Sequence, residues 1–77
     1  MIKYDEVVDR LRTVITCFEF TYNGFPCGVD PFSQNDYDVW YGDNLVKMNS
    51  IDEVINSKFF DGKTLKEIFP HIEIIAY

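Results

Sequence analysis

The sequence predicts an α+β domain: a mostly antiparallel sheet of four to five strands, with an N-terminal helix and two short C-terminal helices on one face. Apolar residues recur with a helical period near the N-terminus and in two short segments after Ser50. Between these segments, and again at the C-terminus, they recur with a period of two. A chain of 77 residues has the length of one domain, so we expect a single domain over 1–77 in the order α-β-β-β-β-α-α-β.

Residues 2–12 are predicted to form the first helix. Four apolar side chains follow the i, i+3, i+4, i+7 spacing and form one stripe: Tyr4, Val7, Val8 and Leu11. Acidic residues stand in the first turn of this segment and arginines in the last, as the helix dipole favours. The stripe is therefore expected to pack against the sheet.

The segment 14–22 is predicted to form a hairpin with the strand that follows it. The Asn23-Gly24 pair between them is typical of two-residue turns, because both turn positions need positive φ. This turn opposes three pairs on a face that we expect to be buried: Tyr22 with Phe25, Phe20 with Cys27, and Phe18 with Val29. The other face carries Cys17, Glu19, Thr21, Pro26, Gly28 and Asp30. The two cysteines lie on opposite faces in this register, so no disulfide is expected.

Turn and capping signals predict the remaining elements. They are a loop around 31–36, a strand at 37–41, a tight turn at 42–44, a short strand at 45–48 and a closing strand at 72–77. Two capping boxes, Ser50 with Glu53 and Thr64 with Glu67, each begin a short helix. Pro70 is expected to end the second of these helices.

The acidic residues are concentrated in the predicted sheet. The net charge is −6, and the chain between Thr13 and Val46 contains no lysine or arginine. The acids of that segment are Glu19, Asp30, Asp36, Asp38 and Asp43. Such a segment repels a phosphate backbone, so direct nucleic-acid binding is not expected. A basic partner is the natural complement, whether it is a protein, a peptide or a cation.

The residues that could support catalysis or metal binding are few. His71 is the only histidine, and the two cysteines lack the spacing of a zinc site. The acids lack the order of a calcium-binding EF-hand loop, and no glycine-rich phosphate-binding motif is present. We therefore expect no metal, no cofactor and no enzymatic activity.

The candidate site is an acidic, aromatic face of the predicted sheet. A period of two places Tyr37, Val39 and Tyr41 toward the core. The candidate interaction residues on the opposite face are Trp40, Asp38, Glu19 and Asp30. A tryptophan flanked by carboxylates can receive an arginine or lysine of a partner. Alternatively a helix covers Trp40, because tryptophan is highly buried on average, and the segment is then simply a strand.

Two stretches of the chain, YNGFPCGVDPFSQNDYDVWYGDN and SIDEVINSKFFDGKTLKEI, resemble small proteins of Gram-positive bacteria and their mobile elements. The resemblance covers most of the chain after Val14 and rests on general appearance. Because no activity is assigned to such proteins, the resemblance implies no functional residue.

These observations lead to one hypothesis and two alternatives. No leader segment is visible, and the apolar runs are far shorter than the roughly 20 residues of a membrane span, so we expect a cytoplasmic protein that does not enter the membrane. The hypothesis is a non-enzymatic interaction module that binds a basic protein surface. The alternatives are a small-ligand-binding module or accessory subunit, with a pocket lined by Tyr37, Trp40 and Tyr41, and a structural homodimer. Monomer and homodimer both stay open.

Overall fold

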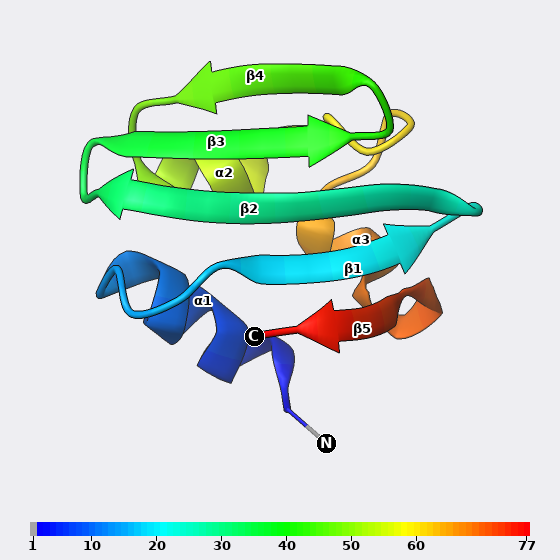
Figure 1. The fold of residues 1–77 in the computed structure, drawn as a ribbon, viewed down its shortest axis with the longest axis horizontal. Coiled ribbons are helices and arrows are strands. Elements are labelled where there is room, and N and C mark those ends of the chain that lie inside the picture. Colours follow the sequence, from blue (N-terminus) through cyan, green and yellow to red (C-terminus); the bar gives the residue numbers. More distant parts are fainter. Residues whose placement is uncertain (1) are drawn as a thin grey trace.

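The computed structural model describes residues 2–77, and its elements follow the predicted order (Figure 1). The elements are α1 (Tyr4–Arg12), β1 (Phe18–Tyr22), β2 (Phe25–Ser33), β3 (Asp36–Tyr41), β4 (Asn44–Met48), α2 (Ile51–Asn56), α3 (Leu65–Ile68), the 3-10 helix η1 (Phe69–His71) and β5 (Glu73–Ala76). The protein is therefore α+β, as predicted.

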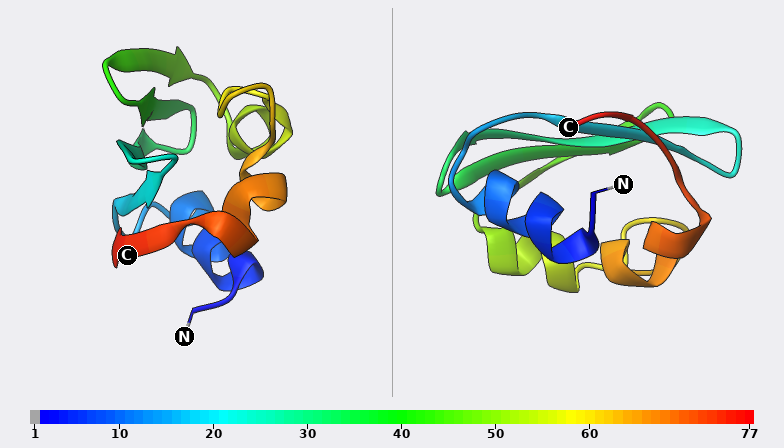
Figure 2. Two further views of the ribbon diagram at one scale, coloured as in Figure 1. Left: turned by 90° about the vertical axis from the view of Figure 1, so that its right-hand side faces the viewer. Right: turned by 90° about the horizontal axis from the view of Figure 1, so that it is seen from below.

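The five strands form one antiparallel sheet in the order β4-β3-β2-β1-β5. Hairpins join β1 through β4, whereas β5 follows the helices and returns to pair with β1. All the helices lie on one side of the sheet (Figure 2). The opposite side is not covered by any helix of residues 2–77. No helix in this described part of the chain is long and apolar enough to cross a membrane.

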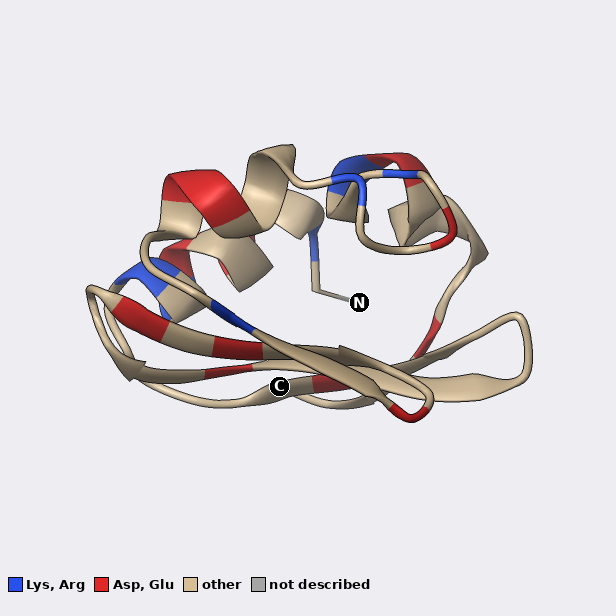
Figure 3. Ribbon diagram, turned by 90° about the horizontal axis from the view of Figure 1, so that it is seen from above, with Lys and Arg blue, Asp and Glu red and all other residues tan. Residues whose placement is uncertain are grey.

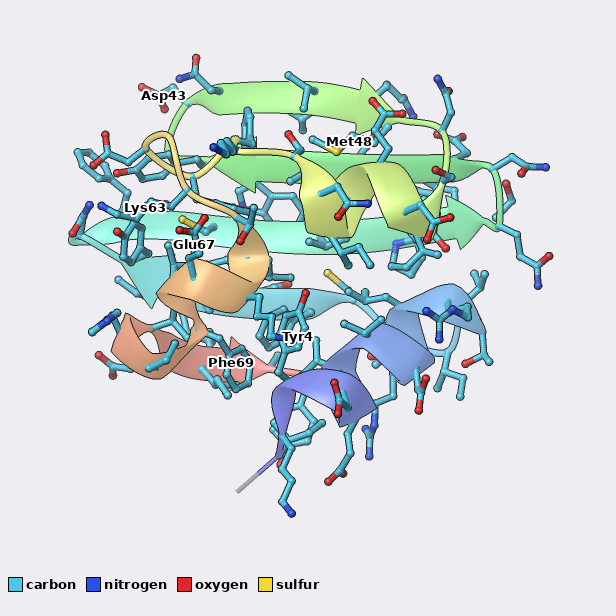
Figure 4. All side chains as sticks on the ribbon, turned by 180° about the vertical axis from the view of Figure 1, so that it is seen from behind. Tyr4, Asp43, Met48, Lys63, Glu67 and Phe69 are labelled. Carbon is cyan, nitrogen blue, oxygen red and sulfur yellow. The ribbon has the colours of Figure 1, made fainter. Side chains whose placement is uncertain are left out.

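The hydrophobic core fills the space between the sheet and the helices. The predicted helical stripe contributes Val7, Val8 and Leu11, which are all buried. The hydroxyl group of Tyr37 in β3 donates a hydrogen bond of 3.1 Å to the carbonyl oxygen of Leu11 and so ties α1 to the sheet. Figure 4 shows Tyr4 beside Phe69, and their rings meet edge to face with centroids 5.5 Å apart. This contact joins α1 to η1.

The predicted register of the first hairpin is confirmed. Phe18 pairs with Val29, Phe20 with Cys27, and Tyr22 with Phe25. The turn residues Asn23 and Gly24 have φ values of 54° and 79°. Five of these six paired residues are buried, but Phe25 is 52% exposed. Its ring lies at the end of the sheet and packs edge-on against Tyr41 rather than under a helix.

Two strands differ from the prediction by more than two residues at one end. β1 begins at Phe18 rather than near residue 14, because Val14 has a φ of 57° in the turn that closes α1. β2 runs through part of the predicted loop as far as Ser33, and its Pro31 pairs with Tyr37 of β3. The missing N–H of this proline is tolerated because β1 pairs with β2 only up to Val29.

One of the two predicted capping boxes forms completely, and the other forms only in part. Thr64 and Glu67 exchange both capping hydrogen bonds, as predicted. Ser50 accepts a hydrogen bond from the backbone N–H of Glu53, but the Glu53 carboxylate accepts from Asn49 instead of Ser50. α3 ends before Pro70, which lies in the first turn of η1, where its missing N–H has no helical partner to lose.

The substitution Gly24→Ala tests how much the hairpin turn contributes to stability. A Cβ at Gly24 meets no atom within 4 Å, so the cost arises only from the positive φ. We expect a loss of about 1–2 kcal/mol in the free energy of unfolding, measured by urea denaturation. A synthetic chain with D-alanine at position 24 is the matched control, because D-residues favour positive φ and should retain stability. Equal stability of the L- and D-alanine proteins would contradict this account.

Candidate functional site

The face of the sheet opposite the helices, called the outer face below, is built from alternate residues of the five strands. Its residues are Leu45, Lys47, Asp36, Asp38, Trp40, Pro26, Gly28, Asp30, Phe32, Glu19, Thr21 and Glu73. The inward neighbours in β3, Tyr37 and Val39, are buried, as predicted for the core side. The outer face is the surface that the viewer meets in Figure 1.

The structure places all four candidate interaction residues on the outer face. Trp40 lies opposite Gly28, and Gly28 lies opposite Glu19, so these residues of β3, β2 and β1 form one row across the sheet. Asp38 lies directly opposite Asp30 in the next row. Glu19 is exposed, and the other three candidates are partly buried. No helix of residues 2–77 covers Trp40.

Gly28 provides the space in which the indole of Trp40 lies. Gly28 is buried although it belongs to the outer face. A Cβ at this position would overlap the six-membered ring of Trp40 and lie 2.8 Å from the carbonyl oxygen of Phe18. The indole therefore extends across β2, with its partial burial coming from the strand beneath it. The register predicted for the hairpin contained Gly28, but the contact depends on the pairing of β2 with β3, which the local sequence pattern did not show.

Lys47 is a charged residue of the outer face whose contacts with the candidate residues the sequence pattern did not reveal. Its ammonium nitrogen lies 2.9 Å from Oδ1 of Asp38 and 3.2 Å from Oδ1 of Asp36, and 4.9 Å from the ring centroid of Phe32. Oδ1 of Asp38 is closed to solvent and makes no well-angled hydrogen bond, so the ammonium group is its charge partner. The nearby carboxylates of Asp38 and Asp36 raise the pKa of Lys47 above its ordinary value.

The position of Lys47 shows which of the acidic residues are compensated within the chain. The lysine follows the segment without basic residues by a single position, and the β3–β4 turn then places it directly opposite Asp38. Asp38 is thus compensated within the chain. By contrast, no lysine or arginine of residues 2–77 lies within ion-pair distance of Glu19 or Asp30. The uncompensated charge of the candidate set is at Glu19 and Asp30.

The thiol of Cys17 reports the electrostatic environment beside these two carboxylates. Cys17 is partly buried and free, and its sulfur lies 3.8 Å from Oε1 of Glu19. Burial, followed by the charges of Asp30 and Glu19, raises the pKa of Cys17 to about 11. Cys27 is also free, and burial raises its pKa. Both thiols are therefore protonated at neutral pH and are poor nucleophiles.

The aromatic pocket considered for a small ligand does not form from the three expected side chains. Tyr37 is buried on the inner side of the sheet and Trp40 lies on the outer face, so the two cannot line one cavity. Tyr41 instead lines a hollow of about 430 Å³ at the end of the sheet. The other residues of this hollow are Phe25, Pro26, Gly42, Asp43 and Asn44.

Within residues 2–77, no three potential metal ligands of the His, Cys, Asp and Glu types lie close enough together to hold an ion.

Comparison of the chain with protein-family models, with curated proteins and with solved structures found no match. The outer face is therefore interpreted from its own chemistry.

The substitution Gly28→Ala tests whether Gly28 provides the space in which the indole of Trp40 lies. The added methyl group overlaps the indole and the backbone of β1, so we expect a loss of about 1–3 kcal/mol in unfolding free energy. The displaced indole should also be more accessible to acrylamide, a fluorescence quencher. Trp40 is the only tryptophan, so its emission can be read without interference. Gly24→Ala, which changes the distant turn, should leave the quenching constant unchanged; equal quenching of both variants would contradict the assignment.

Alkylation of Cys17 by iodoacetamide tests the electrostatics near Glu19 and Asp30. Since the thiolate is the reacting form, a pKa of about 11 predicts that at pH 8 native Cys17 reacts slowly. We expect a rate roughly 200-fold below that of the urea-unfolded protein, whose thiol has an ordinary pKa near 8.5. Mass spectrometry of the peptide that contains Cys17 measures the rate.

The double variant Glu19→Gln, Asp30→Asn is the companion measurement. Removing both negative charges should lower the midpoint of the pH–rate profile, because each charge raises the pKa of Cys17. A native rate within twofold of the unfolded rate, or a midpoint that the double variant does not move, would be inconsistent with the geometry described above.

Proposed function

We propose that the protein is a non-enzymatic interaction module that binds a basic surface of another protein through the outer face. The observation that carries this proposal is the position of Trp40, whose indole lies on the side of the sheet away from the helices. Glu19 and Asp30 flank the same part of this face without a basic partner. An arginine or lysine could contact the indole and pair with a carboxylate at the same time.

The distribution of charge supports the proposal. The strands carry acidic residues on the outer face, and Lys47 of β4 is the one basic residue within them. Figure 3 shows this arrangement: red segments mark the strands with a single blue segment, while the other blue segments lie on the helical side. A face with this excess of negative charge attracts basic surfaces and speeds their association.

The pairing of Asp30 with Asp38 gives a further reason for a partner cation. Like charges directly opposite each other on adjacent strands destabilise a sheet. Lys47 compensates Asp38 from the side of β4, but Asp30 has no such partner on the side of β1. A cation of the partner that approaches Asp30 and Glu19 would reduce this repulsion, so the interaction of the two proteins would be favourable.

The partner class that fits this chemistry is a protein whose basic surface ordinarily contacts nucleic acid. In this form of the proposal, the small protein acts as an inhibitor that occupies the binding site with its own negative charge. We propose that the interaction takes place in the cytoplasm and that the chain is related to the small proteins of Gram-positive bacteria described above.

The fluorescence of Trp40 provides a direct test. Titration with hexaarginine should change the emission of Trp40 and saturate, whereas hexaglutamate should have no effect. Because the contact depends on charge, binding should weaken as salt rises from 50 to roughly 300 mM, where the Debye length is well under 10 Å. Emission that hexaarginine leaves unchanged, or an affinity that is insensitive to salt, would count against the proposed function.

Matched variants locate the binding, with calorimetry as the readout. Glu19→Gln with Asp30→Asn should weaken hexaarginine binding about tenfold, and Trp40→Phe about two- to fivefold, since phenylalanine is the weaker cation–π partner. Glu6→Gln with Asp52→Asn removes the same amount of charge from exposed positions of α1 and α2 and should weaken binding less than twofold. Equal losses in the two double variants would mean that total charge, and not the outer face, determines binding.

One observation favours a second function. The hollow beside Tyr41 combines two aromatic rings with the carboxylate of Asp43, and its Phe25 is 52% exposed. These features suit a small cationic ligand.

Self-association through the outer face is less favourable, because the acidic residues of two copies would repel each other.

A further inference from the structure

The ammonium group of Lys47 occupies a complete cation-binding arrangement on the outer face. Two carboxylate oxygens, from Asp38 and Asp36, lie 2.9 Å and 3.2 Å from it, and the ring of Phe32 lies 4.9 Å away. Two carboxylates and an aromatic ring are the groups that would recognise a lysine or arginine of another protein. The position is thus filled by a cation of the same chain.

The carboxylates around this position need a cation. Oδ1 of Asp38 is closed to solvent, and only 18% of the Asp38 side chain is exposed. Without Lys47, Asp38 would face Asp30 across the sheet and Asp36 along its own strand with no positive charge nearby. A cation that replaces Lys47 would therefore regain most of the electrostatic stabilisation that Lys47 provides.

Lys47 itself lies at the solvent-exposed edge of this arrangement. Its side chain is 60% exposed, and it belongs to β4, a strand at the edge of the sheet. Exposed ion pairs contribute little to stability because water and salt screen them and the long side chain loses freedom.

We infer that Lys47 is an intramolecular competitor of the proposed partner: it holds the cation position formed by Asp36, Asp38 and Phe32, and a basic segment reaches that position only by displacing it. The inference rests on the proposed function of the outer face. It divides that face into an open position at Glu19, Asp30 and Trp40, and a closed position at the β4 edge. A partner with one basic residue uses the open position, and a partner with several basic residues must also compete with Lys47.

The variant Lys47→Met tests this inference, because methionine retains the apolar part of the side chain and removes the charge. Calorimetric titration with hexaarginine should show binding about five- to tenfold tighter than in the wild type. For N-acetylarginine amide, which carries a single positive charge, the same variant should increase the affinity less. Lys63→Met removes the same charge from an exposed turn residue on the helical side and should change either affinity less than twofold.

A second variant tests whether the increase in affinity for hexaarginine depends on the carboxylates of Asp36 and Asp38. The triple variant Lys47→Met, Asp36→Asn, Asp38→Asn should lose the tighter binding of hexaarginine, because the carboxylates of the closed position are gone. Tighter binding in the triple variant would overturn the inference, as would an equal gain from Lys63→Met.

A measurement on the unaltered protein keeps the inference testable even where a variant folds poorly. Saturation with hexaarginine should shift the nuclear magnetic resonance signals of the Lys47 side chain and of the Phe32 ring, since the two groups separate. Unchanged signals at saturation would overturn the inference.

The outcomes separate this inference from the proposed function. If the wild type binds hexaarginine through Glu19 and Asp30 but Lys47→Met binds no more tightly, the inference fails and the proposed function stands. If only Lys47→Met binds, the competition by Lys47 is supported and the proposed function of the wild type fails. Absence of binding in both proteins overturns both proposals.

Discussion

The register of the first hairpin is the constraint on which both faces of the sheet depend. The Asn23-Gly24 turn opposes Phe20 with Cys27 and so sends the aromatic and aliphatic residues of β1 and β2 toward the helices. The same register leaves Gly28 opposite Glu19 on the other face. Because side chains alternate along a strand, a slip by one residue would bury the acids and expose the rings.

The placement of all the helices on one side of the sheet leaves the outer face without a helical cover. The core needs a cover on one face only, and α1, α2 and α3 supply it (Figure 2). Polar and acidic residues can then remain on the outer face, where water solvates them. Trp40 lies among them, and the absence of a side chain at Gly28 lets its indole lie against the backbone. The result is an aromatic group at the centre of an acidic sheet face.

Much of the fold could be predicted because its signals are local. The spacing of Val7, Val8 and Leu11 indicates a helix, and the turn residues of the first hairpin indicate its register. The features that were wrong or missed depend on neighbours distant in the sequence. The length of β2 depends on its pairing with β3 after β1 has ended, and the exposure of Phe25 depends on where the helices stop.

The amino-acid pattern alone specifies which residues share a face of the sheet, because a period of two and a two-residue turn leave one arrangement that buries the apolar side chains. This local pattern is sufficient to group Trp40, Asp38, Glu19 and Asp30 on one side. Which of these charges are compensated, and whether a helix covers the tryptophan, depend instead on contacts between separate elements. The pairing of β4 with β3 brings Lys47 to Asp38, and the packing of the helices on the opposite side leaves Trp40 without a cover.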